Sequence, residues 1–408
     1  MINNEGSTSM KNYICKLLLI VCACLCSVSC TEEQLLNQSV VGNYVDAMLD
    51  FGTTPNTEVS IRTRSTYAPH YESMVRNLYV MIFANDHKVY GRYFGEDDLN
   101  KTTAKEYWTV NNMASDNAAQ TYGTLHMSVP TISSNAEIVL IANIDLDFLN
   151  LSKERLGLIR SKGDLQDMIV TLNQEIPDRN AGYFMMTGSK SGVTISSDGK
   201  ITVPGGKILL NRLDAKIEVN VRVNPYEETN RQKVEEFTPE SWQVINLPKS
   251  SFLIPNVEST SASFYNLSPK NFETTENEVS NGTSTGAVLH GFSFYSLENL
   301  RSGEKKKSVG GNYHHRDRRI KHLDDVNSEN YGTYDTENGM WEYAPEKATY
   351  LIIKGELQMV VDPGLTSEQH LIADVTYLVH LGDFAADKDN YDVVRNTHYK
   401  YTINIKGV

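Results

Sequence analysis

All five cysteines of this chain lie within its first 30 residues, at positions 15, 22, 24, 26 and 30. The sequence after Cys30 therefore has no pair of cysteines that could form a disulfide. A body without disulfides must draw its stability from the burial of apolar side chains. Residues 30–408 are long enough for two domains of ordinary size, each with a core of its own.

The N-terminal segment has the three parts of a secretory signal. Lys11 and Lys16 flank the start of an apolar run over residues 17–26, and small residues follow up to Ser29. The run is too short to span a bilayer, which requires about 20 apolar residues. A positive start, a short apolar stretch and small residues before a cut are typical of a signal peptide. Residues 1–29 are therefore predicted to be removed.

The end of this segment resembles a bacterial lipobox, in which the chain is cut between Ser29 and Cys30 and a lipid such as palmitate is attached to the Cys30 thiol. Ser27 departs from this motif, which usually has Leu at that position. An ordinary signal cut nearby is the alternative. Met10 begins a signal of ordinary form, so residues 1–9 can be an upstream start that is not used. We expect an outer-membrane lipoprotein whose only attached group is this lipid, without a cofactor.

The charge of the chain excludes one class of partner. The formal net charge is −13, and residues 1–29 contribute +1, so the body from Cys30 onward carries −14. Nucleic acid is not an expected partner, because phosphate binding requires a basic surface. The basic residues at 305–307 and 316–322 lie among Gly, Ser and Asn and are expected to form a solvated loop.

Short strand-like runs dominate the body. Between Val75 and Ala84, Leu78, Val80 and Ile82 alternate with other apolar residues, so both faces of this strand are expected to be buried in a two-layer sandwich. Further strands are expected at 137–143, 183–186, 193–196, 200–203, 208–210, 216–223, 242–245, 287–295, 349–361, 371–381 and 399–405. Asp198-Gly199 predicts a hairpin turn.

One helix is expected within this β-rich sequence. Leu165, Met168, Ile169 and Leu172 recur at helical spacing, and Asp164 can cap the start of the helix. The fold class predicted is therefore mainly β, with two tandem β-sandwich domains and one or two short helices in the first.

Composition places the domain boundaries. Residues 30–57 are polar and are expected to form a tether that carries the lipidated cysteine. Asn224-Pro225 and the charged run that follows predict a boundary, which gives an N-terminal domain over 58–224 and a C-terminal domain over 225–408. The C-terminal domain contains long polar loops at 256–286 and 301–340, where a binding surface is expected.

Catalytic and metal-binding patterns are sparse. The chain contains no His-Glu-x-x-His, P-loop or Cys-x-x-Cys motif, so no enzymatic activity is predicted. His314, His315 and His322 lie in a basic stretch, which disfavours a metal cation. The acidic pairs, of which Asp145 and Asp147 alternate on one strand face and the others lie in loops, are expected to be solvated carboxylates rather than a Ca²⁺ site or an acid and base. These are Asp97-Asp98, Asp145 with Asp147, Asp324-Asp325 and the aspartates at 387–389.

The chain resembles the fimbrillins, pilus subunits of the Bacteroidota that are exported as lipoproteins and have two transthyretin-like, Greek-key β-sandwich domains. The resemblance covers nearly all of the body and accompanies the lipobox. It rests on residues 78–83 (Leu-Tyr-Val-Met-Ile-Phe), 184–188 (Phe-Met-Met-Thr-Gly), 211–217 (Asn-Arg-Leu-Asp-Ala-Lys-Ile), 294–299 (Phe-Tyr-Ser-Leu-Glu-Asn), 351–355 (Leu-Ile-Ile-Lys-Gly) and 395–399 (Arg-Asn-Thr-His-Tyr).

This resemblance implies assembly of a fimbria by donor-strand exchange. In the family, an Arg-directed protease cuts after the first strand, the strand and the lipid leave, and a strand of another subunit fills the groove by β-addition. The first strand is expected at 58–61. The cut is expected after Arg64, with Arg62 and Arg76 as lesser candidates, although these can also be ordinary surface arginines. Family shaft subunits continue beyond the strand that matches 399–405, whereas this sequence stops at Val408, which favours a tip or accessory subunit.

Two other functions stay open. The chain could be a monomeric outer-membrane lipoprotein that binds a glycan or another ligand through the loops at 256–286 and 301–340. It could also be a fimbrial anchor that keeps its lipid. A host or bacterial surface receptor is an expected partner of an adhesive subunit, and the sequence does not identify it.

Overall fold

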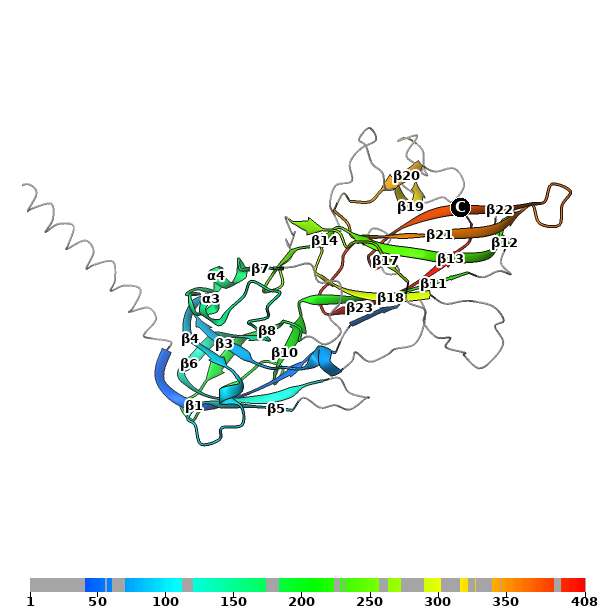
Figure 1. Ribbon diagram of the computed structural model, residues 1–408. Coiled ribbons are helices and arrows are strands. Elements are labelled where there is room, and N and C mark those ends of the chain that lie inside the picture. The colour runs from blue at the N-terminus through cyan, green and yellow to red at the C-terminus, as the bar shows by residue number, and fades with distance from the viewer. Residues whose placement is uncertain are drawn as a thin grey trace, which may run out of the picture.

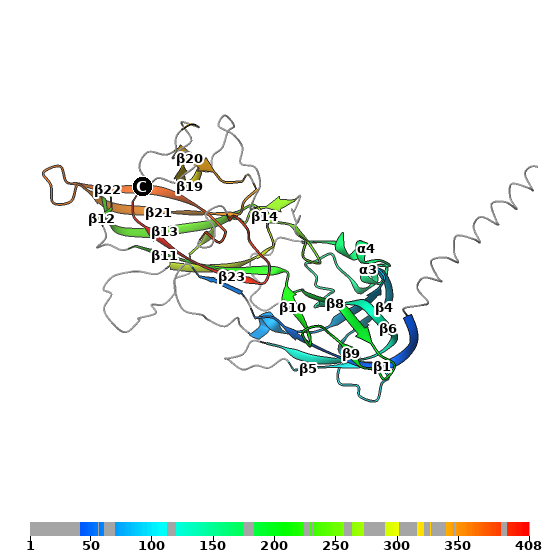
Figure 2. The ribbon, with the colours of Figure 1, turned by 180° about the vertical axis from the view of Figure 1, so that it is seen from behind.

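The computed structural model describes residues 41–55, 57–60, 70–111, 120–173, 183–223, 228–229, 232–256, 263–272, 290–301, 316–321, 327, 340–345, 347–384 and 390–407. Strands dominate these residues, which confirms the mainly β fold class and its short helices. Two β units lie end to end along the molecule (Figures 1 and 2). Within the described part, no helix has the length and apolar character needed to cross a membrane.

The N-terminal unit contains one large sheet. Its strands are β1 (Val41–Thr53), β3 (Leu78–Ala84), β4 (His87–Phe94), β5 (Tyr107–Asn111), β6 (Tyr122–Ala142), β8 (Met186–Ile195), β9 (Ile201–Thr202) and β10 (Ile208–Arg212). Short elements beside the sheet are η1 (His70–Ser73), η2 (Glu96–Asp98), α3 (Lys153–Gly157), α4 (Lys162–Gln166) and β7 (Ile169–Thr171).

The long strand β6 changes partners along its length. Its first half pairs with β1 and β5, and its second half pairs with β3 and β8. The change occurs where the register with β8 shifts between Ile132 and Ala136, and Asn135 there has a positive φ of 55°. Such an irregularity bends a strand and increases its twist. Because β1 also pairs with β10, and β10 with β8, the strands β6, β1, β10 and β8 form a closed ring.

The strand β3 has apolar residues buried on both faces, as its alternation predicted. Leu78, Val80 and Ile82 belong to the core inside the N-terminal sheet, together with Trp108 and residues of β1 and β10. The residues of β3 that point the other way, such as Met81, pack under the segment that contains α3, α4 and β7. This second core continues without interruption into the C-terminal unit.

The C-terminal unit is a sandwich of two sheets. One sheet has the order β18 (His290–Leu297), β11 (Asp214–Val223), β23 (Thr397–Ile405) and β2 (Thr57–Ser60). The other has the order β12 (Glu228–Thr229), β13 (Gln232–Ile245), β21 (Tyr350–Val361) and β22 (Gln369–His380), with β17 (Lys270–Asn271) beside β13. Smaller pairs are β14 (Leu247–Pro248) with β16 (Phe264–Tyr265), β15 (Ser250–Phe252) with β7, and β19 (Arg316–Lys321) with β20 (Met340–Tyr343).

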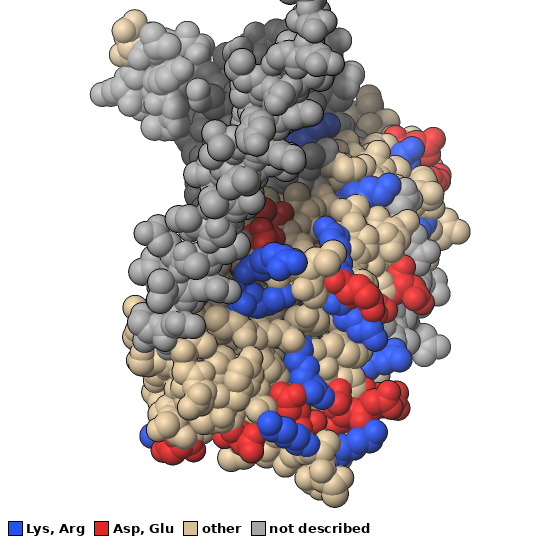
Figure 3. Space-filling view, turned by 90° about the vertical axis from the view of Figure 1, so that its left-hand side faces the viewer, with Lys and Arg blue, Asp and Glu red and all other residues tan. Residues whose placement is uncertain are grey.

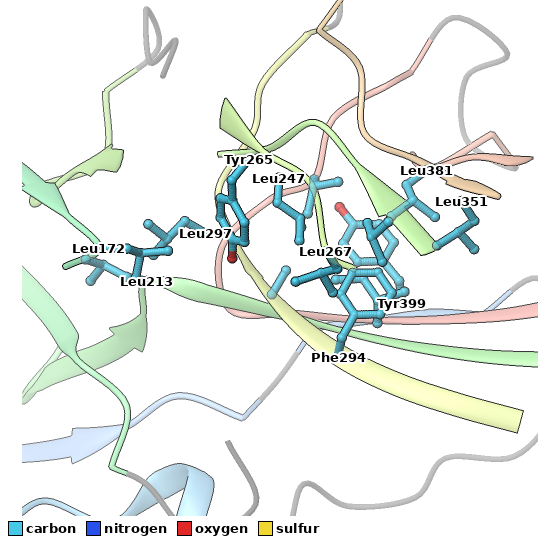
Figure 4. Close-up of a cluster of buried hydrophobic side chains, with 14 of the residues drawn as sticks. Leu172, Leu213, Leu247, Tyr265, Leu267, Phe294, Leu297, Leu351, Leu381 and Tyr399 are labelled. Carbon is cyan, nitrogen blue, oxygen red and sulfur yellow. The ribbon is translucent and has the colours of Figure 1, made fainter. Parts of the chain in front are cut away.

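Aromatic side chains fill the space between these two sheets. The ring of Trp242 on β13 stacks on the ring of Phe292 on β18, with centroids 4.1 Å apart and planes at 9°. Figure 4 shows Phe294 and Tyr399 facing Leu351 and Leu381 across the same core. Offset stacking of this kind adds to the burial energy of large rings. The sandwich therefore holds together without a disulfide, as the cysteine positions required.

A buried ion pair ties the two units at their junction. Arg395 donates to Glu298, with Nη2 2.8 Å from Oε2, and each side chain is only 5% exposed. The same guanidinium donates to the carbonyl oxygens of Leu253 and Phe252 and to the hydroxyl of Ser251. The segment that it holds is β15, which pairs with β7 from the N-terminal half. Arg395 therefore fixes the strand that crosses between the units.

The expected tether over 30–57 is wrong for the part that the structure describes. Residues 41–53 form β1, a strand of the N-terminal sheet, and residues 57–60 form β2 in the C-terminal sandwich. The segment appears polar in sequence because only alternate residues of β1 point into the core. Among the described residues, the first strand of the N-terminal sheet is 41–53, and the strand expected at 58–61 lies at 57–60 in the C-terminal sandwich.

The expected boundary at 224/225 also differs from the structure. The chain passes from the N-terminal sheet to the C-terminal sandwich at Leu213, between β10 and β11. The charged run up to Phe237 includes the start of β13, whose charged residues lie on its outer face while Val234 and Phe237 are buried. Sequence order alone does not reveal that β11 pairs with β18 and β23, which come much later in the chain.

The expected helix is shorter than its spacing indicated. Residues 162–166 form α4, and Ser161 rather than Asp164 is its N-cap, while Asp164 accepts from the Ser161 backbone N–H to complete a capping box. Residues 169–171 form the strand β7 because their backbone pairs with β15. All three residues of β7 are β-branched, which favours an extended backbone.

Substitution of one partner of the buried Arg395–Glu298 pair should strongly lower the free energy of unfolding. Removing one partner leaves an uncompensated buried charge, so Arg395→Met should lower the free energy of unfolding by about 3–5 kcal/mol. Urea denaturation measures this change. Arg222→Met, at a more exposed position on β11, is the control and should cost less than about 1 kcal/mol. The double variant Arg395→Met/Glu298→Leu should lose less than the sum of its single changes; strict additivity would contradict the pairing.

Candidate functional site

The candidate functional site is the groove in the N-terminal sheet that β1 occupies. On one side β1 runs antiparallel to β6, with Leu49 opposite Leu125 and Phe51 opposite Gly123. On the other side it runs parallel to β10, with Phe51 opposite Ile208. β1 is therefore an interior strand of the sheet, and it completes the ring that encloses the N-terminal core.

The side chains of β1 alternate between this core and the outer surface. Ala47, Leu49 and Phe51 point inward, and Leu49 and Phe51 are 2% and 1% exposed. Met48, between Ala47 and Leu49, is 62% exposed. The ring of Phe51 lies over Gly123, where an added Cβ would be 2.4 Å from the ring carbon Cζ. Glycine at 123 therefore provides the space that the largest inward side chain of β1 requires.

The end of β1 is held by hydrogen bonds to both units. The backbone N–H of Thr53 donates to the carbonyl of Thr121, and the N–H of Thr121 donates to the Thr53 hydroxyl, both at 2.9 Å. The N–H of Thr54 donates to the carbonyl of Leu210. One residue later, the carbonyl of Pro55 accepts from the side chain of Asn396 at 3.2 Å. The chain thus crosses from the N-terminal groove to the C-terminal sandwich at Pro55.

After this crossing, β2 lies at the edge of the C-terminal sheet. It runs parallel to β23, with Thr57 opposite Thr397 and Ser60 opposite Lys400. Within the described strands, β2 has a partner on one side, since the sheet order ends with it. One continuous segment, residues 41–60, thus supplies an interior strand to one unit and an edge strand to the other.

The chain that follows the segment 61–69 is fixed independently of β1 and β2. Glu72 in η1 is 0% exposed, and its carboxylate oxygen Oε1 accepts from the Lys216 ammonium and from the Tyr295 hydroxyl, each at 2.8 Å. The guanidinium of Arg212 donates to the Glu72 carbonyl at 2.9 Å. Burial lowers the pKa of Arg212, while the neighbouring Glu72 carboxylate opposes that shift. Glu72 therefore anchors this chain segment to β11 and β18.

Most of the expected processing residues cannot be placed. Ser29, Cys30, Arg62 and Arg64 lie outside the described residues. Arg76 is described: its side chain is exposed near the Tyr183 ring, but its backbone N–H donates to the Asn143 side chain and its neighbours Val75 and Asn77 are buried. A protease must extend the backbone on both sides of the cut, so Arg76 is the least suitable of the three arginines.

The other candidate residues are only partly brought together. His314, His315, His322 and most residues of the loops at 256–286 and 301–340 lie outside the described residues, as does a Gly-x-Ser-x-Gly spacing at 282–286. Asp97, Asp98 and Asp145 line one cavity of the N-terminal unit. Among the residues that the structure covers, no group of three or more His, Cys, Asp or Glu is arranged to hold a metal ion.

Comparison with known proteins gives one family match and several structural likenesses. A family model described as a domain of unknown function, DUF4906, matches residues 294–403. No curated protein matches the chain. The C-terminal sheet strands β18, β21, β22 and β23 fall within or close to the matched range.

Three similar solved structures cover most of the chain at low identity. The tip fimbrial protein Mfa3 of Porphyromonas gingivalis, with a C-terminal truncation, is 17% identical over 88% of this chain and 95% of its own, with a TM-score of 0.43. A putative cell adhesion protein of Parabacteroides distasonis is 14% identical over 89% and 93%, with a TM-score of 0.45. A fimbrilin (fimA) of Porphyromonas gingivalis is 15% identical over 89% and 90%, with a TM-score of 0.41. All three are named as fimbrial or cell adhesion proteins.

Substitutions on the two faces of β1 should differ sharply in their effect on the free energy of unfolding. Phe51→Ala removes a fully buried ring and should lower the free energy of unfolding by about 3–5 kcal/mol. Met48→Ala, on the outer face of the same strand, should change it by less than about 0.5 kcal/mol. Thermal or urea unfolding of both variants measures the difference. Equal effects of the two substitutions would contradict the placement of β1.

The free energy of unfolding should depend on pH through Glu218 on β11, in the sheet that contains β2. A hydrogen bond from the buried ring of His398 lowers the pKa of Glu218 below its ordinary value of 4.5. The folded state therefore holds fewer protons than the unfolded state, and this stabilisation is present above pH 4.5 and is lost as the pH falls through the lowered pKa. Glu218→Gln should therefore cost more stability at about pH 5.5 than at about pH 3.

The size of this pH effect is limited by solvent. The Glu218 side chain is 37% exposed, so the difference should stay below about 1 kcal/mol. Urea denaturation at the two pH values measures it, with Glu236→Gln on the exposed face of β13 as the control. A Glu218→Gln variant whose loss of stability is the same at both pH values would refute the assignment.

Proposed function

We propose that this protein is a structural and adhesive subunit of a cell-surface fimbria, of the tip or accessory kind, assembled by protease-triggered donor-strand exchange. The observation that supports this proposal most directly is β1, an interior strand that precedes the rest of its sheet in the chain. Its inward side chains fill the core, yet one covalent connection, after Pro55, joins it to the rest of the sheet. Such a strand can be exchanged without a change of topology elsewhere.

In this proposal the chain is exported with its lipid on Cys30 and stays at the outer membrane until it is cut. A cut after Arg64, or after Arg62, separates residues 41–60 from the rest of the protein. Both β1 and β2 then belong to the released part. The chain from η1 onward stays in place because the buried carboxylate of Glu72 binds Lys216 and Tyr295.

Release of β1 leaves a groove of defined chemistry. The backbone groups of β6 and β10 that faced β1 become free to bond an incoming strand, and the sites of Ala47, Leu49 and Phe51 become apolar pockets. Strand addition of this kind gains affinity from main-chain hydrogen bonds and specificity from alternate side chains. The incoming strand should run antiparallel to β6 and carry an aromatic residue opposite Gly123.

The proposal predicts that the cut protein is less stable until a strand is supplied. Each buried polar group left without a partner costs about 1–3 kcal/mol, so cleavage by an Arg-specific protease should lower the melting temperature. A synthetic peptide of residues 41–55 should restore it. The same peptide with Met48→Asp should also restore it, while a peptide with Leu49→Asp and Phe51→Asp should not.

Two controls separate this mechanism from general proteolysis. A chain with Arg62→Ala and Arg64→Ala should resist the cut and keep its melting temperature under the same treatment. A cut protein that melts no lower than the intact protein would disprove the exchange of β1. Loss of material at many sites in the double variant would mean that the protease acts elsewhere.

Mass spectrometry of the mature protein from the surface of the producing cell distinguishes the main alternatives. A chain that begins at Ser65 supports loss of the lipid and of both strands. A chain that begins at a lipidated Cys30 supports an anchor, or a monomeric lipoprotein that binds a glycan or another surface ligand.

A further inference from the structure

A cavity of about 450 Å³ opens on the N-terminal unit at a place that the strand exchange does not use. Its walls come from β4, η2, the turn after β6, the start of α3 and the residues next to the ends of η1 and β8. No residue of β1 or β2 lines it. The volume falls in the range of small-molecule sites, which is about 300–1,000 Å³.

The floor of this cavity is rigid. The side-chain amide of Asn143 accepts from the N–H of Arg76 at 2.8 Å and donates to the carbonyls of Met74 and Phe184 at 2.8 and 2.6 Å. The side chain of Asn77 accepts from the N–H of Ile144 and donates to the carbonyl of the same residue. These two buried amides join three chain segments, so the shape of the floor does not depend on a ligand.

The backbone of the floor also departs from ordinary geometry. Asn143 and Asp145 have φ of 58° and 61°, in the left-handed region that non-glycine residues rarely adopt. Asn143 is fixed there by its hydrogen bonds, and Asp145 accepts from the backbone N–H of Lys153 at 3.2 Å. Backbone strain of this kind persists where surrounding contacts enforce it, and it concentrates at binding sites.

Two tyrosine rings form walls of the cavity. Tyr93 and Tyr183 are both half-buried, and the ammonium of Lys153 lies 5.1 Å from the centre of the Tyr93 ring. Burial, followed by the charge of Asp145, raises the pKa of Tyr93, so its hydroxyl stays protonated and can donate. An added Cβ on Gly95 would be 2.8 Å from Cε1 of Tyr93. Glycine at 95 therefore allows this ring to lie where it does.

The cavity is lined by charges of both signs: the carboxylates of Glu96, Asp97, Asp98 and Asp145 and the cations Arg76 and Lys153. Asp98 is bound to Arg92 at 2.9 Å and to the N–H of Gly95, so it is committed to the fold. Within the described residues, Glu96 and Asp97 form no hydrogen bond or ion pair through their carboxylates, and the Lys153 ammonium lies over the Tyr93 ring, with the Glu154 carboxylate near enough to feel its charge.

Arg76, near the Tyr183 ring, is the second cation of the lining. Apart from Asp98, three carboxylates of the lining (Glu96, Asp97 and Asp145) therefore face two cations. Acidic and basic side chains are also interspersed over the end of the molecule seen in Figure 3, without a large area of one sign.

We infer that this cavity, formed by Tyr93, Tyr183 and the charged residues around them, binds a small uncharged saccharide. Sugar hydroxyls can donate to Glu96 and Asp97 and accept from Arg76 and Lys153, and the C–H faces of a sugar ring pack against aromatic rings. An anionic ligand would be repelled by Glu96, Asp97 and Asp145, and Arg76 and Lys153 oppose a cationic ligand. The inference is independent of strand exchange because the lining contains neither β1 nor β2.

Saturation-transfer NMR on the uncut, purified chain tests this assignment with a panel of neutral mono- and disaccharides: glucose, galactose, mannose, N-acetylglucosamine, lactose and cellobiose. Inorganic phosphate and methyl-lysine serve as charged probes, observed by chemical-shift changes of the protein. At least one saccharide should bind. Tyr93→Ala and Asp97→Asn should each weaken that binding by about tenfold, equivalent to about 1.4 kcal/mol.

Two further variants test whether binding depends on the position of the Tyr93 ring and on the residues that line the cavity. Gly95→Ala introduces no charge and should weaken saccharide binding by displacing the Tyr93 ring, with the melting temperature nearly unchanged. Asp147→Asn, a neighbouring carboxylate outside the lining, should leave binding unchanged. The assignment is overturned if no saccharide of the panel binds, if binding survives Tyr93→Ala and Gly95→Ala, or if phosphate or methyl-lysine binds more tightly than every sugar.

Discussion

The ring of β6, β1, β10 and β8 encloses the N-terminal core. Within this ring, β1 is the strand that joins β6 to β10. Because β6 bends near Asn135, its two halves reach different neighbours, and β1 joins the first half to β10. The inward side chains of β1, led by Phe51 over Gly123, then complete the core. A sheet closed in this way has no free edge on either side of β1. Its integrity therefore depends on residues 41–53, which precede the rest of the sheet in the chain.

Buried polar groups keep the two units together around that strand. The carboxylate of Glu72 binds Lys216 and Tyr295, and Glu298 binds Arg395 at the crossing strand β15. Groups of this kind are costly to leave unpaired, so they fix one arrangement of the chain segments that they join. The β1–β2 segment is joined to the C-terminal unit by the hydrogen bond of Asn396 to Pro55 and by the pairing of β2 with β23, and it takes no part in these two buried clusters. The framework can thus persist when the segment is exchanged, which is what the proposed assembly requires.

The removable strand and the tyrosine-lined cavity are separate features of one unit. The first depends on backbone pairing and apolar pockets, and the second on a rigid floor made by Asn77 and Asn143. Neither uses the lining residues of the other. A subunit built in this way can keep a preformed surface site while its sheet accepts a strand from a neighbour.

The sequence by itself determined the features that depend on local patterns. These include the two apolar faces of β3, the Asp198-Gly199 turn with its φ of 81° at Gly199, and the need for large cores in a body without disulfides. It also identified 294–299 and 395–399 as distinctive, although not that Glu298 and Arg395 would meet.

Only the tertiary structure decided where the polar-looking segments belong. Residues 41–53 become a core strand because β6 and β10 offer free backbone groups on both sides, and residues 169–171 leave the helical pattern because β15 pairs with them. The cavity likewise gathers residues that are far apart in the chain, such as Asp97 and Asp145. Long-range pairing leaves no periodic signal in the sequence, since it depends on partners that the chain brings together only when it folds.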